Sequence, residues 1–410
     1  MTAFQNVRPT TMQQEVIARA AALRPLLRAN QDATEALRFP TREVYDVIAQ
    51  AGLFKILRPK RYGGDEMSLD TFYRIIIEIA RGCPNTGWWY ALGTGHNVQV
   101  ASYFSREAQD EIFGLAENFQ APLAFGGVGR TAEKVEGGYV VSGVWHYCSG
   151  VPYASHFMGA LPLPGAPAGS DADLVLIVPD GQFARLDNWG ELVGMKGSGS
   201  HSARLDKVFV PDAMTFISDD GIASLLGTTP GGALHGNALY NGNFRGFAEG
   251  GLAAVSVGLA RAMVDEYEEL VATRNTPGTG RLRAFDENYL RSMGRAVALI
   301  DTAEAAVLAG AARFERYAGE AMRGVAPFSS ERAIRMDGAY HEIEAMTYEA
   351  VGILVRTASS SAIRDGSRVA RYLNGGLMLI SRGHDQFEFR AAAIAREILA
   401  RKRGIDYARA

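Results

Sequence analysis

The chain has 410 residues, of which 47% are hydrophobic and 21% are charged, and its formal net charge is −3. This length allows roughly two or three domains with a large core. The slight negative charge argues against a nucleic-acid-binding protein, whose footprint is a basic patch. No apolar run approaches the ~20 residues that span a bilayer, and the first residues lack the pattern of a secretory signal peptide. Cys83 and Cys148 provide neither a disulfide framework nor a metal site. We therefore expect a soluble, cytoplasmic protein.

Both ends of the chain carry helical periodicity, with apolar residues at three- and four-residue spacing. In the first part, Thr41 and Ser105 stand where helix caps are expected. The expected N-terminal helices cover residues 12–27, 41–52, 68–82, 86–104 and 106–115. A polar, glycine-rich stretch at about 219–242 predicts a loop region. Four long helical patterns with short connections follow and predict a bundle; they cover residues 244–274, 284–317, 329–360 and 367–400.

The middle of the chain, from 121 to 210, is rich in Val and Gly and in short alternating runs. Frequent turns between short strands are typical of an antiparallel barrel or sandwich rather than of a parallel sheet with crossover helices. No Gly-x-Gly-x-x-Gly follows a strand to open a helix, which argues against a Rossmann site. The predicted fold is α+β: an N-terminal helical domain (1–118), a central antiparallel β-barrel or sandwich (119–215), and a linker loop with a C-terminal four-helix bundle (216–410).

This order of domains resembles the acyl-CoA dehydrogenase superfamily over nearly the whole chain. Within the superfamily, the details are more similar to the oxygenase components of two-component (group D) flavin-dependent monooxygenases. The motifs that carry the resemblance are Cys83-Pro-Asn-Thr-Gly-Trp88, Gly137-Gly-Tyr-Val-Val-Ser-Gly-Val-Trp145, Ser149-Gly150, and Gly197-Ser-Gly-Ser200 leading into Val208-Phe-Val-Pro211.

Two departures separate the chain from a dehydrogenase. Trp145 stands where the dehydrogenases usually have a lysine, in a Gly-x-Lys-x-Trp-Ile-Thr pattern that here is Gly143-Val-Trp-His-Tyr-Cys-Ser149. Ile380-Ser-Arg-Gly-His-Asp-Gln386 replaces the Tyr-Glu-Gly-Thr-like run that supplies the catalytic glutamate in many members. His384 in this run matches a histidine of the oxygenase branch. The Arg-Asp pair that often precedes that histidine is missing, so the helix register near His384 stays open.

The resemblance implies a reaction with reduced flavin, either FMNH2 or FADH2, and with O2 as co-substrate. A separate flavin reductase would supply the flavin, O2 would add at the flavin C4a carbon as a hydroperoxide, and a small aromatic substrate, by preference a phenol, would be hydroxylated. A phenol has a pKa of ~10, so a histidine with its ordinary pKa of ~6.5 is a suitable base. The resemblance also implies a homotetramer, with which the alanine-rich bundle helices are compatible.

Histidines are the candidate bases, and two of the seven stand where the oxygenase branch places active-site histidines. His96 follows the Gly-Trp motif by one or two helical turns, and His384 lies near the C-terminus. The competing interpretation of each is a core histidine bonded to a backbone carbonyl. His146 and His201 lie beside the flavin-contact segments, but strand alternation favours a structural role for them.

Ser149 is the third candidate catalytic residue, because a hydroxyl near flavin N5 could stabilise the oxygenated flavin by a hydrogen bond. Each of these residues has a competing interpretation. Ser149 could belong to a plain strand-end turn, Trp145 could be a core residue, and Arg274 could be a solvated surface side chain. The resemblance implies cofactor contacts from Trp88, Trp145, Ser149, Gly150, Gly197, Ser198, Ser200 and Arg274.

Other functions remain open at this point. An FAD-dependent dehydrogenase acting on an acyl thioester would need a carboxylate base, for which Glu249 is the candidate. A member of the oxygenase branch could also oxidise nitrogen or sulfur. A helical assembly protein that has lost its flavin would have the fold without the catalysis. The substrate and the choice between FMN and FAD stay open as well.

Overall fold

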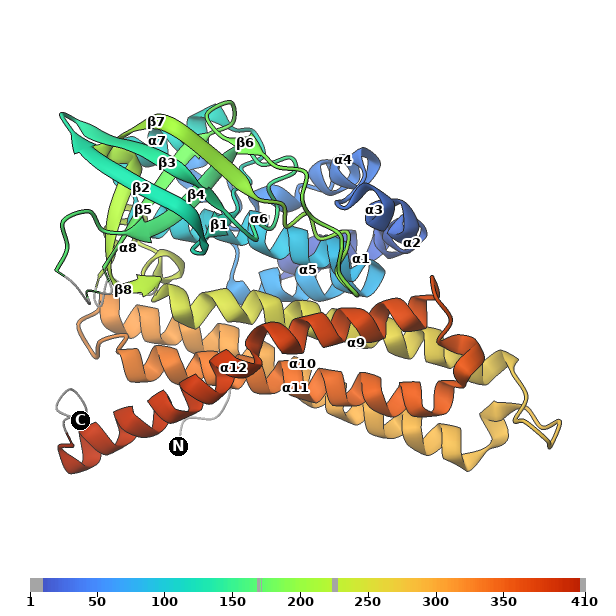
Figure 1. Cartoon of the computed structure of the whole chain (residues 1–410). Coiled ribbons are helices and arrows are strands. Elements are labelled where there is room, and N and C mark those ends of the chain that lie inside the picture. Colours follow the sequence, from blue (N-terminus) through green and yellow to red (C-terminus); the bar gives the residue numbers. More distant parts are fainter. Residues whose placement is uncertain (1–9, 168–169, 171, 223–227, 406–410) are drawn as a thin grey trace.

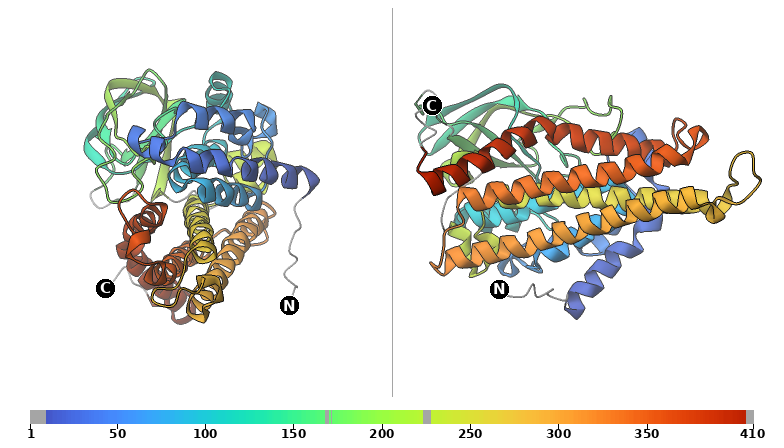
Figure 2. Two further views of the ribbon diagram at one scale, coloured as in Figure 1. Left: turned by 90° about the vertical axis from the view of Figure 1, so that its right-hand side faces the viewer. Right: turned by 90° about the horizontal axis from the view of Figure 1, so that it is seen from below.

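The computed structural model describes residues 10–405 except 168–169, 171 and 223–227, with the backbone alone at 219–222, 245 and 383–389. The β-domain and the N-terminal helices lie side by side, and both rest on the long C-terminal helices (Figures 1 and 2). The predicted order of helical domain, β-domain and bundle is confirmed.

The N-terminal domain consists of short helices and of two longer, largely buried ones, α5 and α6. Thr41, Ser68 and Ser105 cap α4, α5 and α7 by accepting a backbone N–H three residues later. The first expected helix is broken at Leu23, because Pro25 lies in the first turn of the next helix and cannot continue the first. The helices are α1 (Thr11–Ala22), α2 (Arg24–Ala29), α3 (Gln31–Leu37), α4 (Arg42–Gln50), α5 (Leu69–Gly82), α6 (Pro84–Tyr103) and α7 (Arg106–Leu115).

The β-domain is built from two four-stranded sheets, with strand orders β1-β4-β5-β8 and β2-β3-β7-β6. Every pair of neighbouring strands is antiparallel except β1 and β4, which run parallel. The strands are β1 (Leu123–Ala124), β2 (Gly127–Val135), β3 (Gly138–Trp145), β4 (His156–Pro162), β5 (Asp173–Pro179), β6 (Ala184–Arg185), β7 (Ala203–Pro211) and β8 (Thr215–Ile222).

The boundary expected at residue 215 is too early, because β8 pairs with β5 and belongs to the sheet β1-β4-β5-β8. The expected loop at 219–242 also contains a short helix, α8 (Pro230–His235). Thr229 caps this helix and Gly236, at φ +62°, ends it. The glycines that predicted a loop therefore lie partly inside a helix and partly at its end.

The C-terminal bundle is confirmed as four long helices in the described part of the chain: α9 (Phe244–Thr273), α10 (Glu287–Met322), α11 (Ser330–Ala358) and α12 (Arg368–Arg403). The helix at its centre, α9, contacts α5 and α6 as well as the other three bundle helices. Its residues Gly246–Thr273 are long and apolar enough to cross a membrane, but 78% of the most apolar window is buried inside the protein. This apolarity is that of a core helix, most of which is covered by its neighbours.

Candidate active site

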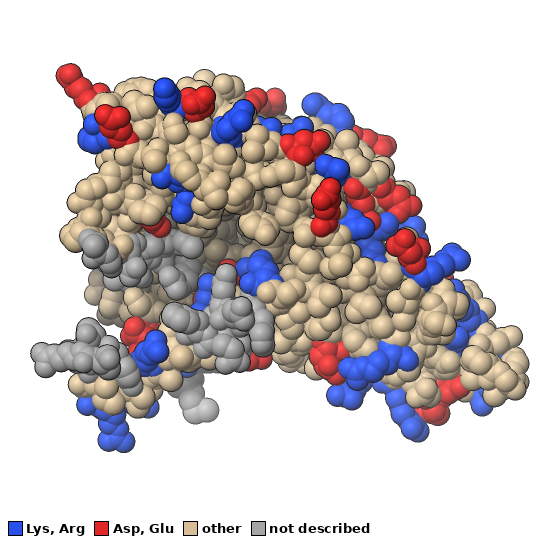
Figure 3. Space-filling view, in the orientation of Figure 1, with Lys and Arg blue, Asp and Glu red and all other residues tan. Residues whose placement is uncertain are grey.

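A cavity of about 660 Å³ lies where α6, the turns of the β-domain, α9 and α12 meet. Figure 3 shows the surface hollowed between the β-domain and the bundle. One face of α6 lines the cavity with side chains spaced by three and four residues, as one side of a helix must be. These residues are Trp88, Ala91, Leu92, Gly95 and His96.

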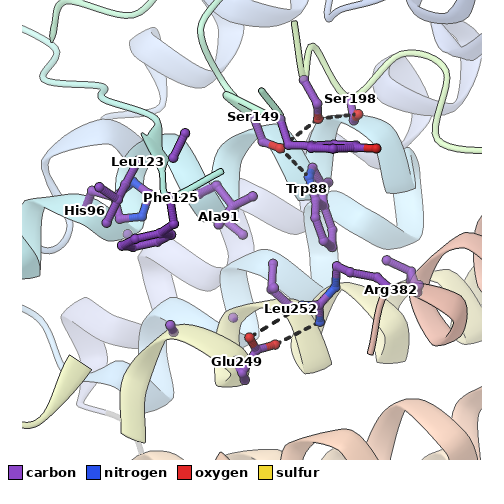
Figure 4. Close-up of a pocket in the computed structure, with 18 of the residues that line it drawn as sticks. Trp88, Ala91, His96, Leu123, Phe125, Ser149, Ser198, Glu249, Leu252 and Arg382 are labelled. Atoms are coloured by element: carbon purple, nitrogen blue, oxygen red, sulfur yellow. Dashed lines mark hydrogen bonds and ion pairs between the residues drawn. The ribbon is translucent and has the colours of Figure 1, made fainter. Parts of the chain in front are cut away.

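A chain of hydroxyl groups forms the wall of the cavity on the β-domain side (Figure 4). Trp88 Nε1 donates to Ser149 Oγ at 3.0 Å, Ser149 Oγ lies 2.7 Å from Ser200 Oγ, and Ser200 Oγ lies 2.9 Å from Ser198 Oγ. An indole N–H can only donate. Ser149 therefore accepts from Trp88, and its own hydrogen points to Ser200 or into the cavity.

The turn that carries Ser149 is held against α6 by an unusual backbone. Tyr147 has φ +57° and Gly150 has φ +98°. A Cβ on Gly150 would lie 3.4 Å from Gly93 Cα. This distance is an ordinary van der Waals contact, so the φ of +98° rather than the proximity of α6 is what favours glycine at position 150. This is a structural role, and Gly150 is not among the residues that line the cavity.

Like Gly150, three more of the expected cofactor contacts, Trp145, Gly197 and Arg274, do not line the cavity in this single chain. The ring of Trp145 is fully buried in the β-domain, where Nε1 donates to Ala160 O at 2.9 Å and the ring packs on Phe157. The N–H of Gly197 donates to Asn85 Oδ1 on α6, away from the cavity. Arg274, just beyond the end of α9, is exposed and donates to Ser361 Oγ at 3.1 Å. A contact from Arg274 across a subunit interface stays a prediction.

His96 lines the far end of the cavity beside Leu123, Phe125 and Phe244. Its Nδ1 lies 2.6 Å from Ala121 O. A carbonyl only accepts, so Nδ1 carries the hydrogen and Nε2 carries the lone pair. Burial lowers the pKa of His96 to about 4 and outweighs the opposing effect of the Ala121 carbonyl. The ring is therefore neutral near pH 7, and its pKa is lower than the ordinary value assumed from the sequence.

The three other histidines named from the sequence lie in different surroundings. His384 lies in α12, in the stretch 383–389 whose side chains are outside the described part of the structure. Strand alternation favoured a structural role for His146. Its ring does bond Ser202 Oγ at 3.0 Å, but it also lines the cavity. His201 is fully buried against Phe39 and is not a lining residue.

Charged groups gather at the bundle side of the cavity. Arg382 of α12 donates to Glu249 of α9 at 2.8 and 3.4 Å and to Glu344 of α11 at 3.0 Å. Burial alone would raise the pKa of Glu249, but Arg382 outweighs it and holds that pKa below its usual value. Burial likewise would lower the pKa of Arg382, but Glu249 and Glu344 raise it. Both partners are charged, so Glu249 is not a free base.

Several lining residues escaped the sequence interpretation. The most exposed is Tyr147, at 70%, whose ring contacts Trp189 edge-on. In the run Gly143–Ser149, Tyr147 occupies the place of the tryptophan in the dehydrogenase pattern, and this signal could have identified it. Trp189, Met195, Phe125, Phe244 and Phe247 also line the cavity, from loops and helix positions that carry no motif.

The cavity offers flat aromatic walls, hydroxyl groups along one side and a neutral histidine at the far end. Such a site suits a planar ligand with hydrogen-bonding edges, together with a second small aromatic molecule. The buried serine hydroxyls and the exposed ring of Tyr147 fit the polar edge and the apolar face of a flavin ring. The residues that would hold the flavin are Trp88, Tyr147, Ser149, Ser198 and Ser200.

The fold and this site define a class of protein. The family profile described as "Acyl-CoA dehydrogenase, N-terminal domain" matches residues 11–113, and that described as "Acyl-CoA dehydrogenase, C-terminal domain" matches residues 250–373. Together they cover more than half of the chain, which belongs to the acyl-CoA dehydrogenase superfamily.

Similar proteins narrow the class. The chain is 29% identical to a pigment production hydroxylase from Rhodococcus sp., over 87% of this chain and 89% of the relative. It is 28% identical to the oxygenase component of an FADH2-dependent resorcinol hydroxylase from Rhizobium sp., over 88% and 90% of the two chains. The fold matches the crystal structure of 3-HSA hydroxylase from Rhodococcus sp. with a TM-score of 0.82 and 22% identity, over 94% and 97% of the chains.

Proposed function

We propose that this chain is the oxygenase component of a two-component flavin-dependent monooxygenase. It would receive reduced flavin from a separate reductase and use O2 to hydroxylate a small aromatic substrate, by preference a phenol. Relatives along most of the chain are named as hydroxylases, one of them as an FADH2-dependent oxygenase component. The observation that carries the proposal is the cavity that holds Ser149 and Trp88 at one side and neutral His96 at the other.

Each end of the cavity has its own role in this proposal. Reduced flavin, when bound, supplies the activated oxygen. The hydroxyl chain of Ser149, Ser200 and Ser198 would orient the polar edge of the flavin ring and hydrogen-bond to it without adding charge. The apolar walls would exclude water from the reacting atoms.

His96 would act on the substrate hydroxyl through Nε2. A base with a pKa of about 4 cannot ionise a resting phenol, whose pKa is ~10. It can accept a hydrogen bond from the phenol and fix the ring position. When a ring carbon gains oxygen, the phenolic O–H becomes strongly acidic, and His96 then takes the proton. His96 is thus a general base in the transition state rather than before it.

The ion pair between Arg382 and Glu249, at the bundle side of the cavity, disfavours the dehydrogenase alternative. An acyl-CoA dehydrogenase needs a carboxylate that is free to take a proton from the substrate, and Glu249 is the carboxylate named for that role. The carboxylate of Glu249 is instead bound by Arg382 through two hydrogen bonds. The proposal also includes a homotetramer and a cytoplasmic location.

Anaerobic titration tests the proposed function. The protein would be titrated with FMNH2, FADH2 and the two oxidised flavins, and then exposed to O2 with a series of phenols. We expect tighter binding of a reduced flavin and a hydroxylated product. Tight binding of oxidised FAD, bleached by an acyl-CoA without O2, would instead establish a dehydrogenase. Binding of no flavin in either redox state would establish a protein without flavin chemistry.

A further inference from the structure

Arg382 lies between the bundle and the hydroxyl chain, and neither the sequence motifs nor the resemblance pointed to it. Its guanidinium is held by carboxylates from two other helices, Glu249 on α9 and Glu344 on α11. The same guanidinium carbon lies 5.6 Å from the centre of the Trp88 ring. Figure 4 shows Arg382 reaching from α12 to Glu249 beneath the Trp88 ring. Three bundle helices therefore converge on one face of this indole.

This contact matters because the Trp88 side chain is only half-buried and borders open space in the cavity. A cation over an aromatic face is attracted by the negative face of the ring. Arginine does this better than lysine, since its planar fork can stack on the ring while it bonds carboxylates at its edges. Arg382 thus limits the rotation of the Trp88 side chain.

The orientation of Trp88 in turn determines the hydrogen bonds of the hydroxyl chain. Its Nε1–H reaches Ser149 Oγ at 3.0 Å, and Ser149 connects to Ser200. With Trp88 donating, one lone pair of Ser149 is occupied and its hydrogen is directed away from the indole. If the indole rotated, Ser149 would lose its donor and its hydrogen would have no fixed direction.

We propose that Arg382 is a positioning residue: it orients Trp88, and through Trp88 it directs the hydroxyl hydrogen of Ser149 away from the indole, towards Ser200 and the cavity. Glu344 contributes to the same positioning, because it accepts a hydrogen bond from Arg382. It does not line the cavity itself. The two carboxylates outnumber the single cation, so the indole is positioned without a net positive charge beside the ring site. The catalytic consequence rests on the proposed function, but the positioning itself does not.

The test uses the flavin-free and the flavin-loaded full-length chain. The variants are Arg382→Met, Arg382→Lys and Glu344→Gln. The matched control is Arg261→Met, since Arg261 is a bundle arginine bonded to two carboxylates, Asp301 and Glu304, and its side chain is 22% exposed, compared with 26% for Arg382. Arg261 does not line the cavity.

The first readout needs no flavin. The chain has four tryptophans, so a ¹⁵N-indole spectrum resolves a small set of N–H signals, and Trp88→Phe assigns one of them. We expect the Trp88 signal to shift or broaden in Arg382→Met and Glu344→Gln, to recover partly in Arg382→Lys, and to stay unchanged in Arg261→Met. An unchanged Trp88 signal in Arg382→Met, or in the isosteric Glu344→Gln if the methionine variant fails to fold, overturns the proposal.

The second readout is the ratio of hydroxylated product to H2O2 with reduced flavin, O2 and a phenol. Loss of one ordinary hydrogen bond corresponds to about a tenfold change. We expect the ratio to fall about tenfold in Arg382→Met, with the KM for the phenol unchanged. An unchanged ratio in a variant whose Trp88 signal has moved overturns the catalytic part. If the wild type forms no product with any phenol, the proposed function fails, and the indole signal alone decides whether Arg382 positions Trp88.

Discussion

The cavity wall and the core of the β-domain each contain a buried histidine and a tryptophan that donates its N–H. His96 in the cavity and His156 at the start of β4 both have a pKa lowered to about 4 by burial. Trp88 donates to a serine that faces the cavity, whereas Trp145 donates to a backbone carbonyl of β4. The pKa alone therefore does not identify an active-site residue. The adjoining open space does, because a base must be able to reach a substrate.

The largest expected effect separates the two histidines by activity. Asparagine keeps a donor near the position of Nδ1 but removes Nε2. Because a positioned general base contributes about a hundred- to ten-thousand-fold, His96→Asn should lower the hydroxylation rate by that factor. His156→Asn should leave the rate within about twofold. The measurement is product formation in a single turnover with reduced flavin. An equal loss of rate in both variants would show that His96 has no role in the reaction that His156 lacks.

The two tryptophans should affect different quantities. We expect Trp145 to matter mainly for stability and Trp88 mainly for coupling, which is the ratio of hydroxylated product to H2O2. Trp145→Ala leaves a hole in a packed core and should lower the free energy of unfolding by about 3–5 kcal/mol. Trp88→Phe keeps a ring beside the cavity and loses only the donor to Ser149. It should cost about 1 kcal/mol of stability and yet lower the ratio of product to H2O2 about tenfold. Urea unfolding and the product assay measure the two effects. A coupling defect in a folded Trp145→Phe protein would contradict the core assignment.

In acid the two histidines should behave alike. Each has a folded pKa of about 4, below the unfolded value of ~6.5. Between these pH values the unfolded chain binds a proton that the folded chain does not, so stability falls as the pH drops from 6.5 towards 4. Between pH 7.5 and 4.5, the free energy of unfolding of either asparagine variant should therefore fall by about 2–3 kcal/mol less than that of the wild type. Urea unfolding at both pH values measures this. Unaltered acid sensitivity would mean that the histidine is not buried in its neutral form.

The smallest expected effect concerns the turn that brings Ser149 to the cavity. Gly150→Ala forces a side chain onto φ +98° and places its Cβ against Gly93. We expect it to lower the free energy of unfolding by about 2–3 kcal/mol. Gly63→Ala is the control: φ is +73° and no atom lies within 4 Å of the added Cβ, so about 1 kcal/mol is expected. Thermal unfolding compares them. Equal costs would show that the φ of +98° at Gly150 adds no strain beyond that of an ordinary left-handed turn.

Local signals predicted most of the fold. Capping residues such as Thr41 and Ser68 act within one turn, and the apolar repeats of the bundle helices reflect the face that each helix buries. The expected boundary at residue 215 left out β8 because the second half of this strand, from Ser218 to Gly221, is polar, and its pairing with β5 is what makes it a strand. Strand pairing depends on a distant segment and is invisible in a local pattern.

The site was predicted less completely, for related reasons. Ser149, Ser198 and Ser200 could be named because the resemblance implies cofactor contacts at these positions, and the structure places all three on the cavity wall. Trp145 was placed at the flavin by the resemblance, whereas its ring lies in the core of the β-domain, as the competing interpretation had it. Tyr147 was missed because its left-handed backbone redirects the side chain. Arg382 gave no local signal, since its partners lie more than thirty residues away in sequence on other helices.

Isotope labelling tests the central claim most directly. The protein would be mixed without air with reduced flavin and a phenol, then with ¹⁸O2, in a single turnover of the wild type, His96→Asn and His156→Asn. The cavity account predicts a hydroxylated product that carries one ¹⁸O atom from the wild type and His156→Asn, and little product from His96→Asn. A product without ¹⁸O, or equal labelled product from all three proteins, would contradict it.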